Sequence, residues 1–354
     1  MHYPWCRKLC PYCDFAVEVG TPEHEGYLAA ILRELDSRAP SFSGRLVSIY
    51  FGGGTPSLWR PDCLAQAIDA VCARFGAARE QLEITIEANP TDCDDTRLAA
   101  WRGAGINRIS IGVQSTAQDE LVVLGRDHRF GDGPAAVARV VGFGGFTVTC
   151  DFILGVPPRK QPAFITDVDH LSVYELTIEE RTAFGQRVRA GRFTPLDEDA
   201  LTELYVATDA ELTAAGFEHY EISSYAKPGK RAVHNSLYWR GAPFLGLGVG
   251  AASLWLAPDG GGERATNPRR AAEYMAAPGT PAERVAIPPA EMAADRAWLG
   301  LRTSDGVEEA TLSTEIVAFL LDGGLGVRRA GRICPTLRGF LMADRIAARI
   351  IEAL

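Results

Sequence analysis

Apolar and polar residues recur with two different periods along residues 21–222. Short runs rich in β-branched and aromatic residues, such as 46–51, indicate strands. Between these runs apolar residues recur at helical spacing, as Ile31 and Leu35 do within 21–38. The expected strands are 46–51, 82–87, 108–114, 147–153, 171–176 and 218–222. The expected helices are 21–38, 61–75, 94–103, 117–124, 134–142 and 197–215.

Strands that alternate with helices form βαβ units around a parallel sheet. Six such units without a Rossmann fingerprint predict an α/β fold, a partial (β/α)6 barrel over residues 1–225. In such sheets the loops at the carboxyl ends of the strands build the binding site. Polar residues at the strand ends are therefore the first candidates for function.

The pattern changes near residue 284. Helical stretches surround a turn-rich segment at 322–327, which predicts a small C-terminal helical or winged-helix-like domain over 285–354. The segment 226–284 between the two domains contains a Gly-rich turn at 258–262 and, at 278–289, an expected linker. The expected C-terminal helices are 289–301, 312–321 and 336–354.

Composition narrows the function classes. The 354 residues, 47% of them apolar, are enough for one large domain and a smaller one. A net charge of −9 argues against nucleic acid as a partner, because phosphate binding needs a basic face. No apolar run of about 18 residues indicates a membrane span, and the start lacks the features of a signal peptide.

The eight cysteines fall into two classes. Three cluster in the first thirteen residues, whereas the others are scattered and predict single thiols, mostly buried. This distribution is typical of a reducing compartment, so we expect a cytoplasmic protein. The scattered cysteines are Cys63, Cys72, Cys93, Cys150 and Cys334.

Cys6, Cys10 and Cys13 have the spacing C-x3-C-x2-C. Three thiolates this close can bind one metal centre, and soft sulfur ligands favour zinc or an iron–sulfur cluster. Both usually take four ligands, and no histidine nearby has zinc-finger spacing. A cubane cluster held by three cysteines leaves one iron free. The alternatives are an ordinary zinc knuckle or three buried thiols.

This loop resembles the signature of the radical S-adenosylmethionine (SAM) superfamily. The resemblance implies a [4Fe-4S] cluster whose open iron binds the amino and carboxylate groups of SAM. An electron from the cluster would then cleave SAM to a 5′-deoxyadenosyl radical. It also implies that Tyr12, inside the loop, belongs to the cofactor-binding residues.

A glycine-rich loop, 52–57, follows the first expected strand. Its glycines allow the backbone to approach a ligand closely, as in a phosphate nest, although the Lys of a P-loop is missing. Beside the cysteine loop it resembles the family's GGGTP element, which contacts the SAM amino group. That resemblance implies Gly53, Gly54 and Thr55 as contacts.

Four polar residues, Glu87, Gln114, Arg126 and Asp151, fall at or just beyond strand ends. A buried carboxylate there needs a cationic or hydroxyl partner, and SAM offers both. Arg126 suits the SAM carboxylate, since a guanidinium binds it bidentately. Asp151 and Gln114 suit the ribose, and Glu87 suits the amino-acid end or the ribose. Alternatively, these residues cap helices or pair with one another.

Further strings narrow the resemblance to the coproporphyrinogen oxidase-like branch, and one of them is the HNxxYW element of the HemW-like haem chaperones. The resemblance covers nearly the whole chain. The strings are Cys-Pro-Tyr-Cys-Asp-Phe (10–15), Phe-Gly-Gly-Gly-Thr-Pro-Ser (51–57), Ile-Gly-Val-Gln-Ser (111–115), Tyr-Glu-Leu-Thr-Ile-Glu (174–179), His-Tyr-Glu-Ile-Ser (219–223) and His-Asn-Ser-Leu-Tyr-Trp (234–239).

Two departures separate the branches. The oxygen-independent coproporphyrinogen III dehydrogenases carry another cysteine two positions after the third and have an N-terminal extension. Phe15 stands at that position here, and the chain opens almost on the cysteine loop. Both features favour a haem chaperone that binds haem and delivers it to an acceptor such as a respiratory or membrane cytochrome. The homodimer state is left open.

The alternatives are a radical-SAM enzyme acting on a porphyrin, such as a coproporphyrinogen III dehydrogenase or a methyltransferase, and a zinc-binding regulatory protein with a winged-helix tail. We assign no catalytic residue. The family's crossover between 157 and 169 is longer than the segment 158–168 found here. The tyrosine that relatives have six residues before the first cysteine lies off the start of this chain.

His234 is the candidate for haem. Imidazole is a common iron ligand, and Tyr238 and Trp239 are placed to pack against a porphyrin face. The alternative is a structural histidine satisfied by hydrogen bonds. His219 and His170 are weaker candidates.

Overall fold

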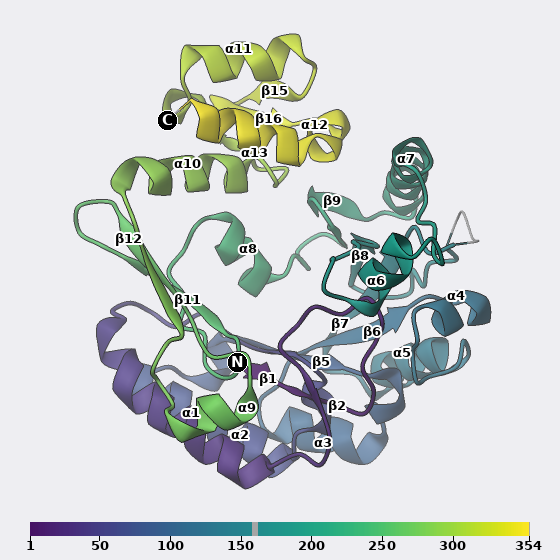
Figure 1. Ribbon diagram of the computed structural model, residues 1–354, viewed down its shortest axis with the longest axis vertical. Coiled ribbons are helices and arrows are strands. Elements are labelled where there is room, and N and C mark those ends of the chain that lie inside the picture. The colour runs from purple at the N-terminus through teal and green to yellow at the C-terminus, as the bar shows by residue number, and fades with distance from the viewer. Residues whose placement is uncertain (158–161, 354) are drawn as a thin grey trace.

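A curved sheet of eight strands forms the centre of the computed structural model, which describes residues 1–157 and 162–353 (Figure 1). Its strand order is β1-β4-β5-β6-β7-β8-β10-β9. The six strands from β1 to β8 in this order pair in parallel. They are β1 (His2–Tyr3), β4 (Ser48–Gly53), β5 (Glu83–Ala88), β6 (Arg108–Gln114), β7 (Thr147–Leu154) and β8 (His170–Glu175). The predicted partial α/β barrel is confirmed.

The far edge of the sheet differs from the prediction. A sixth parallel strand was expected at 218–222, but β9 (Glu218–Glu221) forms an antiparallel hairpin with β10 (Ser224–Ala226). The unpredicted β10, not β9, pairs with β8, and it runs antiparallel to it. A hairpin needs only a short connection, whereas a parallel strand needs a crossover of a dozen or more residues.

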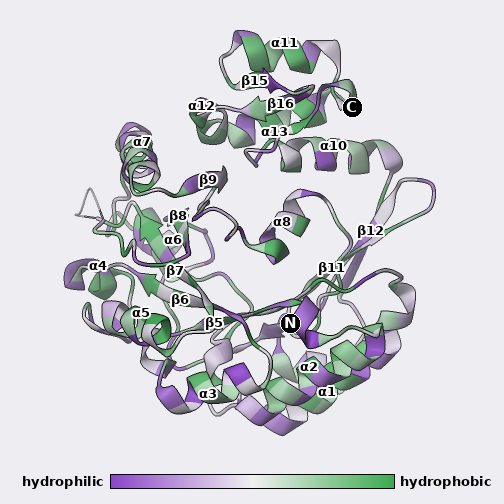
Figure 2. Cartoon of the chain, turned by 180° about the vertical axis from the view of Figure 1, so that it is seen from behind, coloured by the Kyte–Doolittle hydropathy of each residue, from purple (hydrophilic) through white to green (hydrophobic). Residues whose placement is uncertain are grey.

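Helices cover the convex face of the sheet and bury its outward-pointing residues. Along β4, Ile49 and Phe51 are buried in the core, whereas Ser48 and Tyr50 point the other way. Both colours appear around α2 in Figure 2, as expected for a helix with one face on the core. These helices are α1 (His24–Arg38), α2 (Pro61–Phe75), α3 (Asp95–Gly103), α4 (Gln118–Val123) and α5 (Asp132–Phe143).

Local signals set the helix ends. Asp94 accepts a hydrogen bond from the Arg97 backbone N–H at the start of α3, and Asp197 does the same for Ala200 at the start of α7 (Glu198–Ala214). The left-handed Gly76, with φ 61°, ends α2.

The described part of the short crossover, 162–169, contains no helix, and 158–161 lie outside the described residues.

The segment after the barrel returns to the N-terminal side of the sheet. The short α8 (Val233–Trp239) lies across the open side of the barrel (Figure 1). A three-stranded antiparallel sheet follows, made of β11 (Ala252–Leu256), β12 (Gly262–Thr266) and β13 (Glu283–Ile287). The stretch 278–289, expected as a linker, therefore contains a strand of this sheet. Three short elements of the barrel part are β2 (Trp5–Cys6), β3 (Glu18–Val19) and α6 (Ala183–Arg189). The segment after the barrel also contains α9 (Ala271–Ala276).

A buried polar network joins this segment to α1. The Glu34 carboxylate accepts hydrogen bonds from Arg38, Asn267 and Tyr274, the last at 2.7 Å. All four side chains are buried, so the network satisfies polar groups that would otherwise oppose folding.

The C-terminal part has its own apolar core and packs helices around a small sheet, β14-β16-β15. The expected helices 289–301 and 312–321 are confirmed, whereas 336–354 divides into two helices. The elements are α10 (Pro289–Gly300), β14 (Val307–Glu308), α11 (Thr314–Asp322), β15 (Gly326–Arg329), β16 (Arg332–Pro335), α12 (Leu337–Leu341) and α13 (Ala343–Glu352).

Candidate cofactor site

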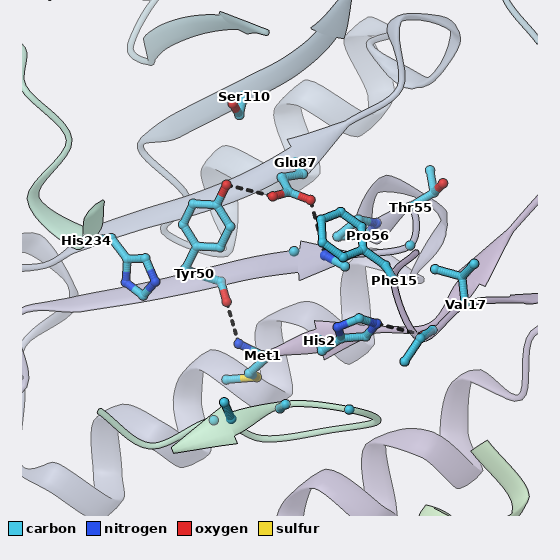
Figure 3. Close-up of a pocket in the computed structure, with 18 of the residues that line it drawn as sticks. Met1, His2, Phe15, Val17, Tyr50, Thr55, Pro56, Glu87, Ser110 and His234 are labelled. Carbon is cyan, nitrogen blue, oxygen red and sulfur yellow. Dashed lines mark hydrogen bonds between the residues drawn. The ribbon is translucent and has the colours of Figure 1, made fainter. Parts of the chain in front are cut away.

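One cavity of about 1100 Å³ opens inside the barrel, between the cysteine loop, the ends of the parallel strands and α8. The twelve residues expected as cluster ligands, SAM contacts or the haem ligand all line it, although they come from positions 6 to 234 of the chain. They are Cys6, Cys10, Tyr12, Cys13, Gly53, Gly54, Thr55, Glu87, Gln114, Arg126, Asp151 and His234. Figure 3 shows how part of this lining is arranged.

The three loop cysteines are free thiols at one end of the cavity. Thr55 Oγ1 donates to Cys6 Sγ at 3.3 Å, and an Arg126 Nη donates to Cys10 Sγ at 3.7 Å. Burial raises the pKa of Cys6 to about 11 and also raises the pKa of Cys13, so a metal is needed to hold these sulfurs as thiolates.

The thiols suit a cluster with an open iron. Within 1–157 and 162–353, no three His, Cys, Asp or Glu residues converge on the position of a single ion. A cubane binds each thiolate to a different iron, so its three cysteine sulfurs need not converge on one point. The five scattered cysteines are free and buried, as the sequence predicted.

The short helix α6 supports the cysteine loop from outside. The Phe184 backbone N–H donates to the Pro11 carbonyl at 2.9 Å, and the Phe184 ring lies 6.4 Å from that of Tyr12. The apolar pattern of the sequence does not indicate this helix. Thr182, which accepts a hydrogen bond from the Gly185 N–H, was the available N-cap signal.

Glycine is required in the loop after β4. Gly53 has φ 110°, and a Cβ there would lie 2.6 Å from the His2 ring. A Cβ on Gly54 would lie 2.8 Å from the Pro4 carbonyl oxygen. The Gly53 N–H donates to Glu87 Oε2 at 3.2 Å, which ties this loop to the next strand.

Two of the carboxyl groups that line the cavity, those of Glu87 and Asp151, accept hydrogen bonds from hydroxyls. Tyr50 donates to Glu87 Oε1 at 2.7 Å (Figure 3), and Ser110 donates to Asp151 at 2.9 Å. Burial nevertheless raises the pKa of Glu87 to about 7 and that of Asp151 to about 6, because desolvation disfavours the charged form. Both groups therefore suit an ammonium or hydroxyl ligand that offsets the desolvation.

Arg126 offers an unused donor. Its Nη atoms reach the Gly112 carbonyl at 3.2 Å and the Tyr12 hydroxyl at 3.5 Å, but its buried Nε has no hydrogen-bond partner among residues 1–157 and 162–353. A ligand carboxylate would satisfy that donor. Gln114 lies beside it in a left-handed conformation, with φ 63°, where the pairing of β6 with β7 is irregular. A Cβ on Gly112 would lie 3.0 Å from the Gln114 amide nitrogen.

His234 lies at the other end of the cavity, on α8. Its Nδ1 is 3.0 Å from Ser48 Oγ, and its ring stacks on Tyr50 with centroids 4.7 Å apart. Burial lowers the pKa of His234 to about 3, so the imidazole is neutral, as an iron ligand must be. The Tyr238 ring meets the His234 ring edge to face, with ring centroids 5.0 Å apart, and also lines the cavity.

The other aromatic and histidine candidates lie elsewhere. Trp239 does not line the cavity, whereas Tyr238, the other residue expected to pack against a porphyrin face, does. His219 pairs with Asp209, and His170 contacts the Tyr220 hydroxyl at 2.8 Å, both outside the cavity lining.

The sequence missed the apolar wall between the two ends. Ser48 begins β4 and Tyr50 lies inside it, so neither is at the carboxyl end of the strand, and only their two-residue spacing places them on one face with Gly52. Further apolar lining comes from distant segments: Phe42, Leu46, Val71, Phe75, Leu237, Phe244 and Leu245.

The family model of the radical SAM superfamily matches residues 1–166. The chain is 38% identical to the heme chaperone HemW of Escherichia coli over 288 residues, which is 78% of this chain and 74% of the relative. The chain belongs to the HemW-like branch of the radical SAM superfamily. It is also 32% identical to the HemW of Synechocystis over 88% of this chain and 79% of the relative.

A mitochondrial protein and a solved structure are also similar to this chain. The mouse radical S-adenosyl methionine domain-containing protein 1, a mitochondrial protein, is 35% identical over 74% of this HemW-like chain, a match that spans 61% of the mouse protein. The structure of coproporphyrinogen III oxidase (HemN) from Escherichia coli matches with a TM-score of 0.80 and 20% identity, covering 100% of this chain and 89% of the other. That likeness shows the fold.

No helix in the described ranges is long and apolar enough to cross a bilayer.

Proposed function

We propose that the protein is a haem chaperone that binds a [4Fe-4S] cluster, SAM and haem, and delivers haem to an acceptor protein such as a respiratory cytochrome. The observation that carries the proposal is a single cavity with two chemically different ends. One end holds three free thiols and buried charged groups, and the other holds a neutral imidazole beside aromatic rings. A site for a single drug-sized ligand has about 300–1,000 Å³, and this cavity of about 1100 Å³ exceeds the upper end of that range.

Membership of the superfamily implies the cluster and SAM. Cys6, Cys10 and Cys13 would hold the cluster, which supplies the electron for reductive chemistry on SAM. Arg126 would bind the SAM carboxylate through its unpaired Nε, and Glu87 would face the ammonium. The remaining polar groups, Tyr12, Gln114, Asp151 and the backbone of residues 53–55, would orient the rest of the molecule.

Haem is proposed at the other end. Ser48 holds His234 Nδ1, which leaves Nε2 for iron. The Tyr238 ring and the surrounding apolar residues would cover the porphyrin and exclude water. The free buried cysteines favour a reducing compartment, and we place the protein in the cytoplasm.

The experiment uses anaerobically reconstituted protein. Haem is titrated while the Soret band is followed, and SAM, dithionite and coproporphyrinogen III are then added while 5′-deoxyadenosine and protoporphyrinogen are assayed. Stoichiometric haem binding, transfer to an apo-cytochrome and no decarboxylation support the proposal. Decarboxylation coupled to SAM cleavage would instead identify a coproporphyrinogen dehydrogenase.

A pair of histidine variants tests the assigned end of the cavity. His234→Ala is expected to weaken haem binding at least tenfold, because it removes the iron ligand. His219→Ala removes a histidine outside the lining and is expected to leave haem binding unchanged. Equal effects of the two substitutions would contradict the assignment. Sedimentation of the same samples, with and without haem, reports whether the protein forms a homodimer.

A further inference from the structure

Tyr50 touches both ends of the cavity. Its hydroxyl donates to Glu87 Oε1 at 2.7 Å, at the end where SAM is proposed to bind. Its ring stacks on the His234 imidazole, with centroids 4.7 Å apart and planes inclined by 18°. Figure 3 shows Tyr50 standing between these two side chains.

The strand geometry keeps Tyr50 in this position. Ser48 and Tyr50 are two residues apart on β4, so both side chains point into the barrel, and Ser48 holds the same imidazole at 3.0 Å. Gly52 continues this face, and a Cβ there would lie 2.8 Å from Tyr50 Cε1 and 3.0 Å from Glu87 Oε1. The absence of a side chain at Gly52 therefore allows the Tyr50–Glu87 hydrogen bond to form.

The neighbouring strand β5 also has one residue that holds the His234 segment and one that lines the proposed SAM end. Glu83, at the start of β5, accepts hydrogen bonds from the backbone N–H groups of Val233 and His234, at 3.1 and 2.8 Å. Glu87 lies four residues further along the same strand and faces the proposed SAM end. Each strand therefore carries one residue that holds His234, Ser48 on β4 and Glu83 on β5. Tyr50 is the side chain that contacts both His234 and Glu87 directly.

We propose that Tyr50 couples the two ends, so that SAM binding tightens haem binding and haem binding tightens SAM binding by the same factor. The inference rests on the proposed function, since it requires both ligands in this cavity. An ammonium beside Glu87 favours the ionised carboxylate, which is the stronger acceptor for the Tyr50 hydroxyl. A firmly held Tyr50 ring in turn orders the imidazole that receives haem, and linkage makes the effect reciprocal.

Substituting Tyr50 with Phe removes the hydroxyl but keeps the ring that stacks on His234. The dependence of haem binding on SAM is therefore expected to be lost, and it is measured as the ratio of the variant's own haem Kd values with and without SAM. A matched control is Tyr274→Phe, which also removes a tyrosine hydroxyl that donates to a buried carboxylate at 2.7 Å, but outside the cavity lining. It shares any general destabilisation and should keep the coupling.

The experiment is a haem titration of the cluster-loaded protein, followed by the Soret band, with and without saturating SAM. Calorimetric SAM titrations with and without haem measure the reverse direction. For wild type and Tyr274→Phe we expect the haem Kd to fall at least about fivefold with SAM, the lower range of measured couplings. For Tyr50→Phe the ratio should fall to within about twofold of one.

Two results would overturn the coupling alone: both ligands bind the wild type but the haem Kd does not respond to SAM, or Tyr50→Phe keeps the full response. In either case the proposed haem-binding function still stands. Failure of the wild type to bind haem would overturn both proposals, and the missing Soret change distinguishes that outcome from a mere loss of coupling.

Discussion

The guanidinium of Arg7 forms a bidentate ion pair with the carboxylate of Asp92, with N–O distances of 2.5 and 3.1 Å. Arg7 lies between the first two cysteines of the loop, and Asp92 follows β5. The Asp92 side chain is fully buried and also accepts hydrogen bonds from Ser57 and Arg97. The pair therefore anchors the cysteine loop to the carboxyl end of the sheet.

This anchor predicts a selective defect in Arg7→Ala. The loop loses its bidentate contact, so the iron bound per chain after reconstitution should fall by at least half. Arg7 is 41% exposed, but Asp92 is fully buried and keeps only its hydrogen bonds from Ser57 and Arg97, so the free energy of unfolding should fall by about 1–3 kcal/mol. Iron analysis and urea unfolding measure the two quantities.

Arg97→Ala is the matched control for that experiment. Arg97 also donates to Asp92, at 3.2 Å, and its side chain is 34% exposed, but it lies outside the cysteine loop. It should reduce stability by a similar amount and leave the iron content unchanged. Equal iron loss in both variants would show that Asp92 acts on general stability and not on the loop.

Substitutions of the loop cysteines are expected to affect the cluster and haem binding differently. Replacing Cys6, Cys10 or Cys13 with Ala should abolish the cluster but leave haem binding intact, since His234 lies at the other end of the cavity. Iron content and the Soret titration measure this on one sample. Cys72→Ala, which removes a buried thiol outside the cavity lining, should keep a full cluster. A full cluster in any of the three loop variants would contradict the assignment.

The sequence identified the polar end of the cavity more completely than the apolar end. The cysteines, the glycine loop and Gln114 lie in motifs or at a strand end, where the chemistry of a parallel sheet gathers. Asp151, expected at a strand end, lies inside β7 instead. Ser48 and Tyr50 lie within the run 46–51, where apolar residues occupy both faces, so its pattern alone does not show which face turns inward.

Long-range contacts were also beyond the sequence pattern. Arg7 and Asp92 are 85 residues apart and share no periodicity. The three residues of β10 are too few to show a strand period, and for that reason the antiparallel edge of the barrel was missed. The strand and helix order from β4 to α7 was largely predicted, because each element is long enough for its period to show.

Glu87 predicts that SAM binding depends on pH. Its pKa is raised to about 7 by burial, so the group is mostly protonated at pH 6 and ionised at pH 7.5. Since the ionised form attracts an ammonium, SAM affinity should fall as pH falls below 7, approaching tenfold per pH unit. Calorimetric titrations at constant ionic strength between pH 6 and 7.5 measure this slope.

Glu87→Gln separates this effect from that of Asp151, whose pKa is raised to about 6. The variant should bind SAM more weakly and lose the dependence between pH 6.5 and 7.5, while a weaker decline near pH 6 remains. An unchanged slope in Glu87→Gln would assign the pH dependence to another group.

Gln114 predicts a trade-off between stability and binding. It is one of two non-glycine residues with positive φ in the described chain, at 63°, and such a conformation costs about 1 kcal/mol for a residue with a side chain. Gln114→Gly relieves this strain and should raise the stability of the protein without ligands by about 0.5–1 kcal/mol. The same change removes an amide beside Arg126, so SAM affinity should fall several-fold.

Ala330→Gly provides the comparison, because Ala330 is the other residue with positive φ, at 48°, in the turn between β15 and β16. It should stabilise the protein similarly, as measured by thermal unfolding, and leave the SAM Kd unchanged. If Gln114→Gly lowers stability while Ala330→Gly raises it, then Gln114 contributes contacts to the fold that outweigh its strain. Greater stability together with weaker SAM binding in Gln114→Gly alone would show that the strained backbone is retained for the ligand.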